Sequence, residues 1–242
     1  MISASPQPLQ ITIDHRFCGP PESGNGGYVC GRVAEHMNGC AKVRLMSPPR
    51  LGVPLSLLCS DEGVLLFDEG LLIAKAVPHQ LSLKVPPCPS VEMARSISDR
   101  YAGFSHTPFP LCFVCGPERK KNDGLRIFPG VSTDESLVAC VWEPGSDLFD
   151  PEGQLQTWAI WSALDCPSGW AFLHRGKGPA LLGEYAVDVF SSETSGQACI
   201  VIGWEIECSG RKHETGSALY TAEGRLMACA QATWIEFKPG SI

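Results

Sequence analysis

The chain has 242 residues and a formal net charge of −7; 44% of its residues are hydrophobic and 19% are charged. These values predict one or two globular domains with a sizeable core. They argue against a nucleic-acid partner, which would require a basic face, and against an anionic membrane surface. Residues 1–15 lack the basic and apolar regions of a secretory signal, and no apolar run is long enough to span a membrane, so we expect a cytoplasmic protein.

The first helix is expected over residues 27–37, directly after the glycine-rich turn GNGG. Apolar residues recur at near-helical spacing from Tyr28 to Met37, and Gly39 follows as a stop signal. Glycine-rich turns that open helices often hold phosphates. The spacing here fits neither the P-loop nor the dinucleotide fingerprint, so we do not expect a phosphate loop.

Strands are predicted at residues 55–60 and 63–67, and a further strand follows the turn that begins at Asp68. The proline-containing stretch 85–99 is typical of a linker that carries a short amphipathic helix. We therefore place a first unit in residues 1–84 and a linker in residues 85–104.

Cys112 and Cys115 form a C-x-x-C pair, which is the one such pair among the 12 cysteines of the sequence. A zinc site usually needs a second pair or nearby histidines, and no residue downstream of this pair has ligand spacing. A redox pair would need a thioredoxin-like context, whereas this segment is a loop with prolines. A structural role is the favoured interpretation and no cofactor is expected, but metal and redox roles remain open.

The second unit, residues 105–242, repeats the same order of elements with two more strands, GLRIFPG (124–130) and LVACVWEP (137–144), ahead of its helix. That helix is expected over residues 154–172, and it is buried because it is apolar on most sides. Pro167 should bend or restart it. Strands follow at 198–208, at 216–221 and after the turn at Glu223. The repeat predicts an α+β fold made of two copies of a central helix wrapped by an antiparallel sheet.

Three segments carry a family resemblance: GNGGYVCGRVAEHM (24–37), CFVCGPERKKNDGLRIFPG (112–130) and WAIWSALDCPSGWA (158–171). The second resembles the segment that leads into a strand in PaaI-like hotdog thioesterases, and the other two resemble the central helix of that fold. Two copies in one chain are similar to the tandem, or double, hotdog acyl-CoA thioesterases, and the similarity covers most of residues 15–236. It implies a double hotdog that hydrolyses acyl-CoA or another acyl thioester.

The resemblance also implies a catalytic site shared between the two copies. The single-domain form of the family opens its helix with His-Gly-Gly and has an acidic residue about nine positions later. In the first copy, Asn25 takes the place of the histidine and Ala34 the place of the acid. In the second copy, Asp165 fits the acidic position, but Gln156 stands near the histidine position. Since tandem members commonly combine an amide from one helix with a carboxylate from the other, Asn25 and Asp165 are the expected catalytic pair.

Thioester hydrolysis requires an activated water and a donor for the developing oxyanion. Asp165 suits either the general base or a nucleophile, and Asn25 suits a donor or a water-orienting group. The backbone N–H groups of Gly26 and Gly27 would be free donors at the start of a helix. The alternatives are structural: Asn25 as a plain helix cap, and Asp165 as a local cap bonded to the N–H of Ser168.

Weaker candidates for substrate contacts lie elsewhere in the second half. Gln156 and Thr157 could line a substrate channel, although plain helix-surface positions are the alternative. Arg211 and Lys212, with His213, are expected in a basic turn between two strands that could meet the phosphates of coenzyme A. An ordinary solvated hairpin is the alternative there.

Trp158, Trp161 and Trp170 could wall an acyl pocket, with core packing as the alternative. Two rival functions remain. A double-hotdog hydratase or dehydratase usually carries an Asn-Pro-x-His segment, and none is present. A hotdog shell that binds an acyl ligand without turnover is the non-enzymatic rival. The chain could also pair into a homo-oligomer.

Overall fold

The computed structural model describes residues 9–194 and 198–237. Within these residues, the strands form one antiparallel sheet of 11 strands in the order β1-β3-β4-β5-β2-β8-β11-β10-β9-β7-β6. Its strands are β1 (Leu9–Thr12), β2 (Ala41–Leu45), β3 (Pro54–Ser60), β4 (Gly63–Asp68), β5 (Leu71–Pro78), β6 (Gly130–Val131), β7 (Val138–Trp142), β8 (Ala180–Val189), β9 (Cys199–Ser209), β10 (Lys212–Thr221) and β11 (Leu226–Glu236).

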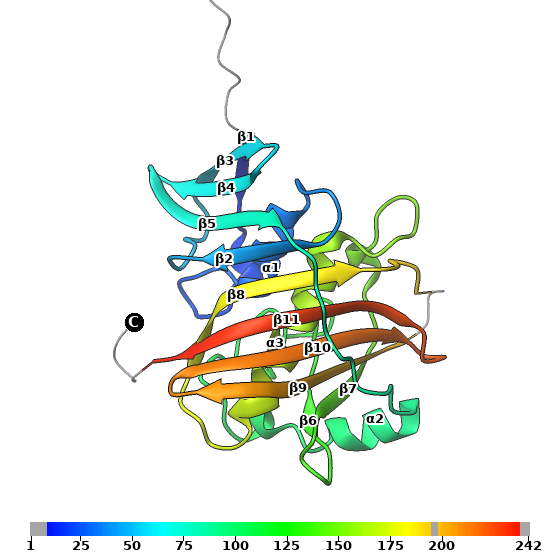
Figure 1. Ribbon diagram of the computed structural model, residues 1–242. Helices are drawn as coiled ribbons and strands as arrows, with labels where there is room; N and C mark the ends of the chain where they lie inside the picture. Colours follow the sequence, from blue (N-terminus) through cyan, green and yellow to red (C-terminus); the bar gives the residue numbers. More distant parts are fainter. Residues whose placement is uncertain (1–8, 195–197, 238–242) are drawn as a thin grey trace, which may run out of the picture.

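Two helices, α1 (Gly26–Ala34) and α3 (Thr157–Leu173), pack against each other behind the sheet as viewed in Figure 1. The first contacts β2, β5 and β8, and the second contacts β9, β10 and β11. Each half of the chain thus wraps its own part of the sheet around its own helix, which confirms the predicted α+β fold. In the described residues, no helix is long and apolar enough to cross a membrane.

The two halves of the sheet join where β2 pairs with β8 in antiparallel register, from Ala41 opposite Val187 to Arg44 opposite Glu184. Lys42 and Glu184 add an ion pair on the solvent-facing side of this seam. The seam makes the sheet continuous, so the two helices lie side by side on one surface rather than in separate domains.

Helix α1 begins where Asn25 caps it, because the side-chain Oδ1 of Asn25 accepts a hydrogen bond from the N–H of Tyr28 at 2.9 Å. It ends at Ala34, and residues 35–37 continue as turns before Gly39, whose φ is +73°. The predicted helix over residues 27–37 was therefore correct in place but extended too far at its C-terminus.

Helix α3 runs without interruption through Pro167, so the restart that the sequence allowed does not occur. Proline removes one intrahelical hydrogen bond, and side chains bond to the carbonyls just before it. Ser217 Oγ donates to the carbonyl of Leu164 at 2.7 Å, and Ser168 Oγ donates to the carbonyl of Asp165 at 2.6 Å. These bonds anchor the turn of α3 that carries Asp165.

The two helices cross closely because α1 has glycine where α3 approaches it. A Cβ on Gly31 would lie 2.6 Å from Trp158 Cα, and a Cβ on Gly27 would lie 2.4 Å from Asp165 Cβ. Both distances are shorter than real Cβ contacts, so only glycine allows this approach. Gly27 and Gly31 of α1 therefore allow the two helices to pack in direct contact.

The predicted strand at residues 124–130 is mostly absent. β6 contains two residues, and Arg126 has a φ of +55°, which a strand cannot accommodate. The N–H groups of Leu125 and Ile127 instead bond to the carbonyls of Phe113 and Val114. This segment therefore pairs with the loop that contains the C-x-x-C pair, and it covers that loop on one side.

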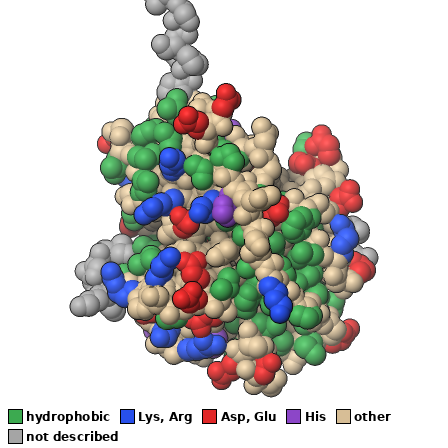
Figure 2. All heavy atoms as spheres, in the orientation of Figure 1, with side chains coloured by type: hydrophobic (Ala, Val, Ile, Leu, Met, Phe, Trp, Pro, Cys, Tyr) green, Lys and Arg blue, Asp and Glu red, His purple; other side chains and the backbone are tan. Residues whose placement is uncertain are grey.

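Residues 79–90 cross the outer face of the sheet and lead to α2 (Val91–Ser98), the short helix predicted in the linker (Figure 1). Tyr220 Oη donates to the carbonyl of Pro86 at 2.7 Å and fixes the crossing over β10. Hydrophobic side chains gather on this part of the surface, whereas charged side chains are mixed over the rest of the face shown in Figure 2. The crossing segment thus occupies the outer face of the second half.

Candidate active site

Asn25 and Asp165 are in direct contact. Asn25 Nδ2 donates to Asp165 Oδ2 at 2.8 Å, and the two residues are 3% and 1% exposed. The Oδ1 atom of Asn25 is already held by the N–H of Tyr28, so its amide can only point its Nδ2 toward the carboxylate. The helix cap and the contact with Asp165 are therefore two functions of one side chain.

Asp165 does not act as the local cap that was the alternative for it. Its side chain bonds to Asn25, and its contact with Ser168 is made through its backbone carbonyl. Among the described residues, no hydrogen-bonding group meets Asp165 Oδ1, which is buried. One carboxylate oxygen is thus held by Asn25 of the first half of the chain, and the other is buried without a hydrogen bond of good geometry from the described residues.

Burial, and to a smaller extent the neighbouring Cys112, raises the pKa of Asp165 to about 7. The hydrogen bond from Asn25 and the backbone N–H of Gly27 act in the opposite direction, because they favour the charged form. A carboxyl group with a pKa near neutrality can exist as acid or base under ordinary conditions. Such a group in a cavity is a functional-site candidate on physical grounds.

A cavity of about 360 Å³ opens onto this pair, which is large enough for a small-molecule ligand. Asn25, Gly26 and Asp165 lie in its wall, together with Trp170 and Trp234. The remaining lining is mainly apolar and comes from both halves of the chain: Leu45, Met46, Phe109, Leu173, Leu181, Leu182 and Ile235. Among the described residues that line this cavity, Asp165 and Glu22 are the charged ones, and none is a lysine or an arginine.

Of the three predicted tryptophans, only Trp170 lines the cavity. Trp158 and Trp161 are in the core, against α1 and Tyr185. Trp234, which was not predicted from the sequence, donates its Nε1–H to Ser168 Oγ at 2.9 Å and thereby joins the cavity wall to α3.

Gly26 and Gly27 are the first two residues of α1, so their N–H groups have no carbonyl partner within the helix. Gly26 lines the cavity, whereas Gly27 packs against Asp165 and the carbonyl of Trp161. The two predicted donors thus differ in position: Gly26 is open to the cavity, and the N–H of Gly27 is close enough to Asp165 to favour its ionised form.

Gln156 and Thr157 lie at the start of α3, away from the cavity lining. The Nε2 atom of Gln156 faces the carbonyls of Asp147 and Phe149 at 3.3 and 3.4 Å, and its Oε1 accepts from Trp158. The amide of Gln156 is therefore bonded within the protein on both sides.

His213 is not in a turn, which corrects the expectation from sequence. It lies in β10, fully buried, with its ring nitrogens 3.2 Å from Glu205 and 2.6 Å from Glu236 and its ring stacked on Phe172. Lys212 is the first residue of the same strand, and Arg211 precedes it in the turn. Both basic residues are next to the end of β11, because Lys212 is paired with the cavity-lining Ile235 and Arg211 reaches the carbonyl of Glu236.

Three cysteines line the cavity beside Asp165, and one of them, Cys166, was not predicted from the sequence. Cys112, Cys115 and Cys166 have converging sulfur atoms, and Asn25 Nδ2 lies 3.9 Å from Cys112 Sγ. Cys166 follows Asp165 directly in α3. Its position next to Asp165 was a signal in the sequence, because the residue that follows an inward-facing acid in a buried helix lies close to the same part of the cavity wall.

No protein-family model matches the chain, and a search of curated proteins finds no match. Solved structures do match over nearly full length. The structure of a protein described as a candidate thioesterase II from Thermobifida fusca has a TM-score of 0.63 and 14% identity, over 97% of this chain and 94% of that one. The acyl-CoA thioesterase II TesB2 of Mycobacterium marinum has a TM-score of 0.57 and 12% identity, over 99% and 96%.

A protein of unknown function with a hot dog fold, from Alicyclobacillus acidocaldarius, also matches, with a TM-score of 0.59 and 10% identity over 98% of this chain and 96% of that one. Identities this low establish a shared architecture and leave the chemistry to the site itself. The chain therefore has the double-hotdog fold, as its resemblance to the tandem thioesterases implied.

Proposed function

We propose that this protein hydrolyses acyl thioesters, with acyl-CoA as the substrate class. The observation that carries this proposal is the contact of Asn25 with Asp165 in the wall of an apolar cavity to which both halves contribute. The cavity suits the acyl group, and the polar pair suits the reacting carbonyl. The likeness to thioesterase II structures supports the same reaction class.

In the proposed reaction, Asp165 acts as general base. Its Oδ1, which no described group bonds, accepts a proton from a water molecule as the water oxygen attacks the thioester carbonyl. The oxyanion then accepts hydrogen bonds from the second N–H of the Asn25 amide and from the N–H of Gly26 at the start of α1. Collapse of the tetrahedral intermediate breaks the carbon–sulfur bond, and the proton held by Asp165 goes to the leaving thiolate.

The phosphates of coenzyme A would lie outside the cavity, because the part of its lining that the structure describes has no lysine or arginine. Arg211 and Lys212 are the proposed contacts for them, since the turn that contains Arg211 adjoins the cavity-lining end of β11. Gln156 and Thr157 take no part in this proposal, because the amide of Gln156 is occupied within the protein.

The test is thiol release from acyl-CoAs of several chain lengths, followed continuously for the wild type and for two variants. Asp165→Asn removes the base and should lower kcat by about 10²–10⁴-fold, and Asn25→Ala should lower it by about 10²–10³-fold. Asp61→Asn is the matched control, because Asp61 is an exposed residue in the turn between β3 and β4.

Two results would reject the proposal. Full activity in both variants would show that another site does the chemistry. A wild-type protein that is inert toward the whole series, but releases heat on binding acyl-CoA in calorimetry, would be a binding module instead.

A further inference from the structure

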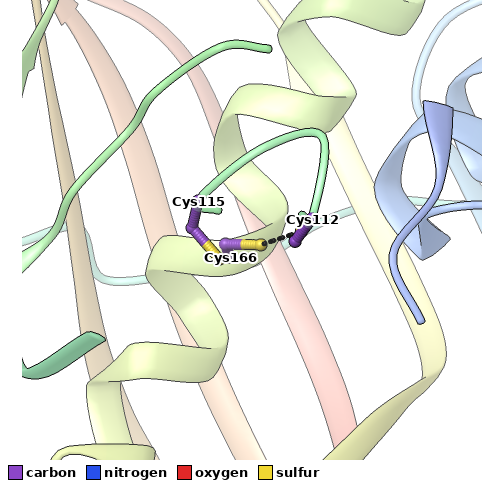
Figure 3. A group of neighbouring side chains, drawn as sticks. All are labelled: Cys112, Cys115 and Cys166. Carbon is purple, nitrogen blue, oxygen red and sulfur yellow. Dashed lines mark hydrogen bonds between the residues drawn. The ribbon is translucent and has the colours of Figure 1, made fainter. Parts of the chain in front are cut away.

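The thiols of Cys112, Cys115 and Cys166 lie in one group, each less than 10% exposed, with all three Sγ atoms within 4.8 Å of one another. The distance between the Sγ atoms of Cys112 and Cys166 is 3.7 Å. Figure 3 shows Cys112 and Cys115 on one loop, with Cys166 of α3 between them. The reaction proposed above uses none of these sulfurs.

The loop is shaped to bring its two cysteines together. The N–H of Gly116 donates to the carbonyl of Cys112 at 2.9 Å and closes a tight turn around the C-x-x-C pair. A Cβ on Gly116 would lie 2.5 Å from the carbonyl oxygen of Pro110, so glycine is required there. This spacing of two cysteines is the usual one for metal-binding loops, and the third sulfur arrives from a rigid helix.

The sulfur spacing fits a single cation. Zinc–thiolate bonds are about 2.3 Å long, so tetrahedral coordination places neighbouring sulfurs about 3.8 Å apart. The 3.7 Å between Cys112 and Cys166 agrees with this spacing. A disulfide would require a contact of about 2.05 Å. A four-iron cluster would place each cysteine on a different iron and hold the sulfurs further apart than a single ion does.

We propose that Cys112, Cys115 and Cys166 bind one thiophilic cation of the zinc type, with a fourth coordination position facing the cavity. Thiolates select soft or borderline cations. Three protein ligands and one open position are the arrangement of zinc sites that exchange a ligand, whereas structural sites use four. All three cysteines line the cavity, so the fourth position would be open to water or to a ligand in it.

Binding would release protons and transfer no electrons: three thiols and one divalent cation give a three-thiolate complex and three protons. The indole N–H of Trp170 is available to bond the thiolate of Cys115 from outside the coordination sphere. It lowers the pKa of that thiol, as the hydrogen bonds with Cys112 and Cys166 do to a larger extent. Such outer contacts orient and tune metal ligands.

The experiment is a titration of full-length protein, reduced and stripped with a chelator, with Co²⁺ as the spectroscopic probe and Zn²⁺ as the competitor. We expect one molar equivalent of Co²⁺ to produce sulfur-to-cobalt charge-transfer absorption, and Zn²⁺ to abolish it. Single substitutions Cys112→Ser, Cys115→Ser and Cys166→Ser should each weaken Co²⁺ binding by more than about 100-fold, because changes outside the coordination sphere already cost 10–100-fold.

Two controls isolate the cluster. Cys140→Ser changes a buried cysteine of β7 outside the cluster. Cys208→Ser changes a second group of potential ligands, with Glu205 and His213; both nitrogens of that histidine already face carboxylates. Both control variants should bind Co²⁺ as the wild type does.

The open position has its own test, because added cyanide should shift the visible spectrum of the Co²⁺ protein. Absence of charge-transfer absorption in the wild type would overturn the proposal, as would its persistence in the three cluster variants. Loss of the charge-transfer absorption in Cys208→Ser would overturn the proposal too. A spectrum that cyanide leaves unchanged would overturn the open fourth position. Circular dichroism and thermal melting establish that each variant folds, and the wild-type titration decides the matter if a cluster variant does not fold.

Discussion

Asn25 of the first half of the chain and Asp165 of the second half are separated by 140 positions in sequence and joined by a 2.8 Å hydrogen bond. The same amide caps α1 through its oxygen. The site therefore depends on the packing of α1 against α3. The role of Asn25 in the proposed reaction can be tested separately from its role as a helix cap.

Asn25→Ser should separate the two roles of this residue. Serine is a good helix cap, so the melting temperature should stay close to that of the wild type. Serine cannot reach Asp165 as the longer amide does, so kcat should fall by about 10²–10³-fold. Thermal melting and thiol release on the same preparation give both values. A parallel loss of stability and activity would mean that Asn25 is only a cap.

Hydrolysis should depend on the ionisation of Asp165, whose pKa is raised to about 7 by burial. A general base is active when deprotonated, so kcat in chelator-treated enzyme should rise about tenfold per pH unit below 7 and level off above it. Asp165→Asn should remove this limb from the pH profile. A flat profile in the wild type between pH 5 and 8 would contradict the assignment of Asp165 as base.

Asp165 should also make the stability of the metal-free protein depend on pH. Its pKa is higher in the folded chain, about 7, than the value near 3.8 of a free carboxyl group, so the folded state binds more protons between these values. Stability should therefore fall as pH rises through this window, by a few kcal/mol at most. Asp165→Asn should be more stable than the wild type at pH 8 and show less of this slope in denaturant titrations. A variant that is less stable than the wild type at pH 8 would indicate a structural role for the carboxylate.

Gly31→Ala should destabilise the protein, because the added Cβ would lie 2.6 Å from the backbone of α3 at Trp158. Overpacking of this kind costs about 1–3 kcal/mol, and the change in helix spacing should reduce activity as well. Gly178→Ala is the matched control, since its Cβ would have ordinary contacts. Equal unfolding midpoints in urea for the two variants would show that the helices do not cross as closely as described.

Arg211→Glu and Lys212→Glu should raise KM for acyl-CoA and leave KM unchanged for the corresponding acyl-pantetheine, which lacks the nucleotide phosphates. The increase should shrink at high salt, because exposed charges are screened. If both substrates respond alike, the two side chains act through the fold rather than through phosphate contacts.

The elements that were predicted correctly are those with a local signal. The cap and period of α1, the uninterrupted apolar character of α3 and the hairpins from β3 to β5 and from β9 to β11 follow from spacing and turn residues. The β2–β8 seam has no such signal, since its two strands are about 140 positions apart and pair through backbone atoms. The segment at 124–130 alternates as a strand does, but tertiary contacts with residues 113 and 114 determine its conformation.

The candidate site was predictable only as far as the family resemblance reached. Asn25 and Asp165 were selected on that basis, and their contact depends on a helix crossing that no local pattern reveals. Cys166 was missed because C-x-x-C spacing draws attention to neighbours in sequence, whereas the third sulfur arrives from a helix about 50 residues later. Gly27 was expected to be an open donor, and its role in helix packing was not visible from sequence.

The two halves of the chain contribute different polar side chains to the candidate site. Gln156 begins α3 as Asn25 begins α1, but the residue nine positions after Asn25 is Ala34, where the other helix has Asp165. A duplicated fold would offer two equivalent sites. One has the Asn25–Asp165 pair, whereas the other would combine Gln156 with Ala34, and the amide of Gln156 is already bonded to its own loop. Each chain should consequently saturate with a single acyl ligand, and its binding isotherm should show no cooperativity within the chain.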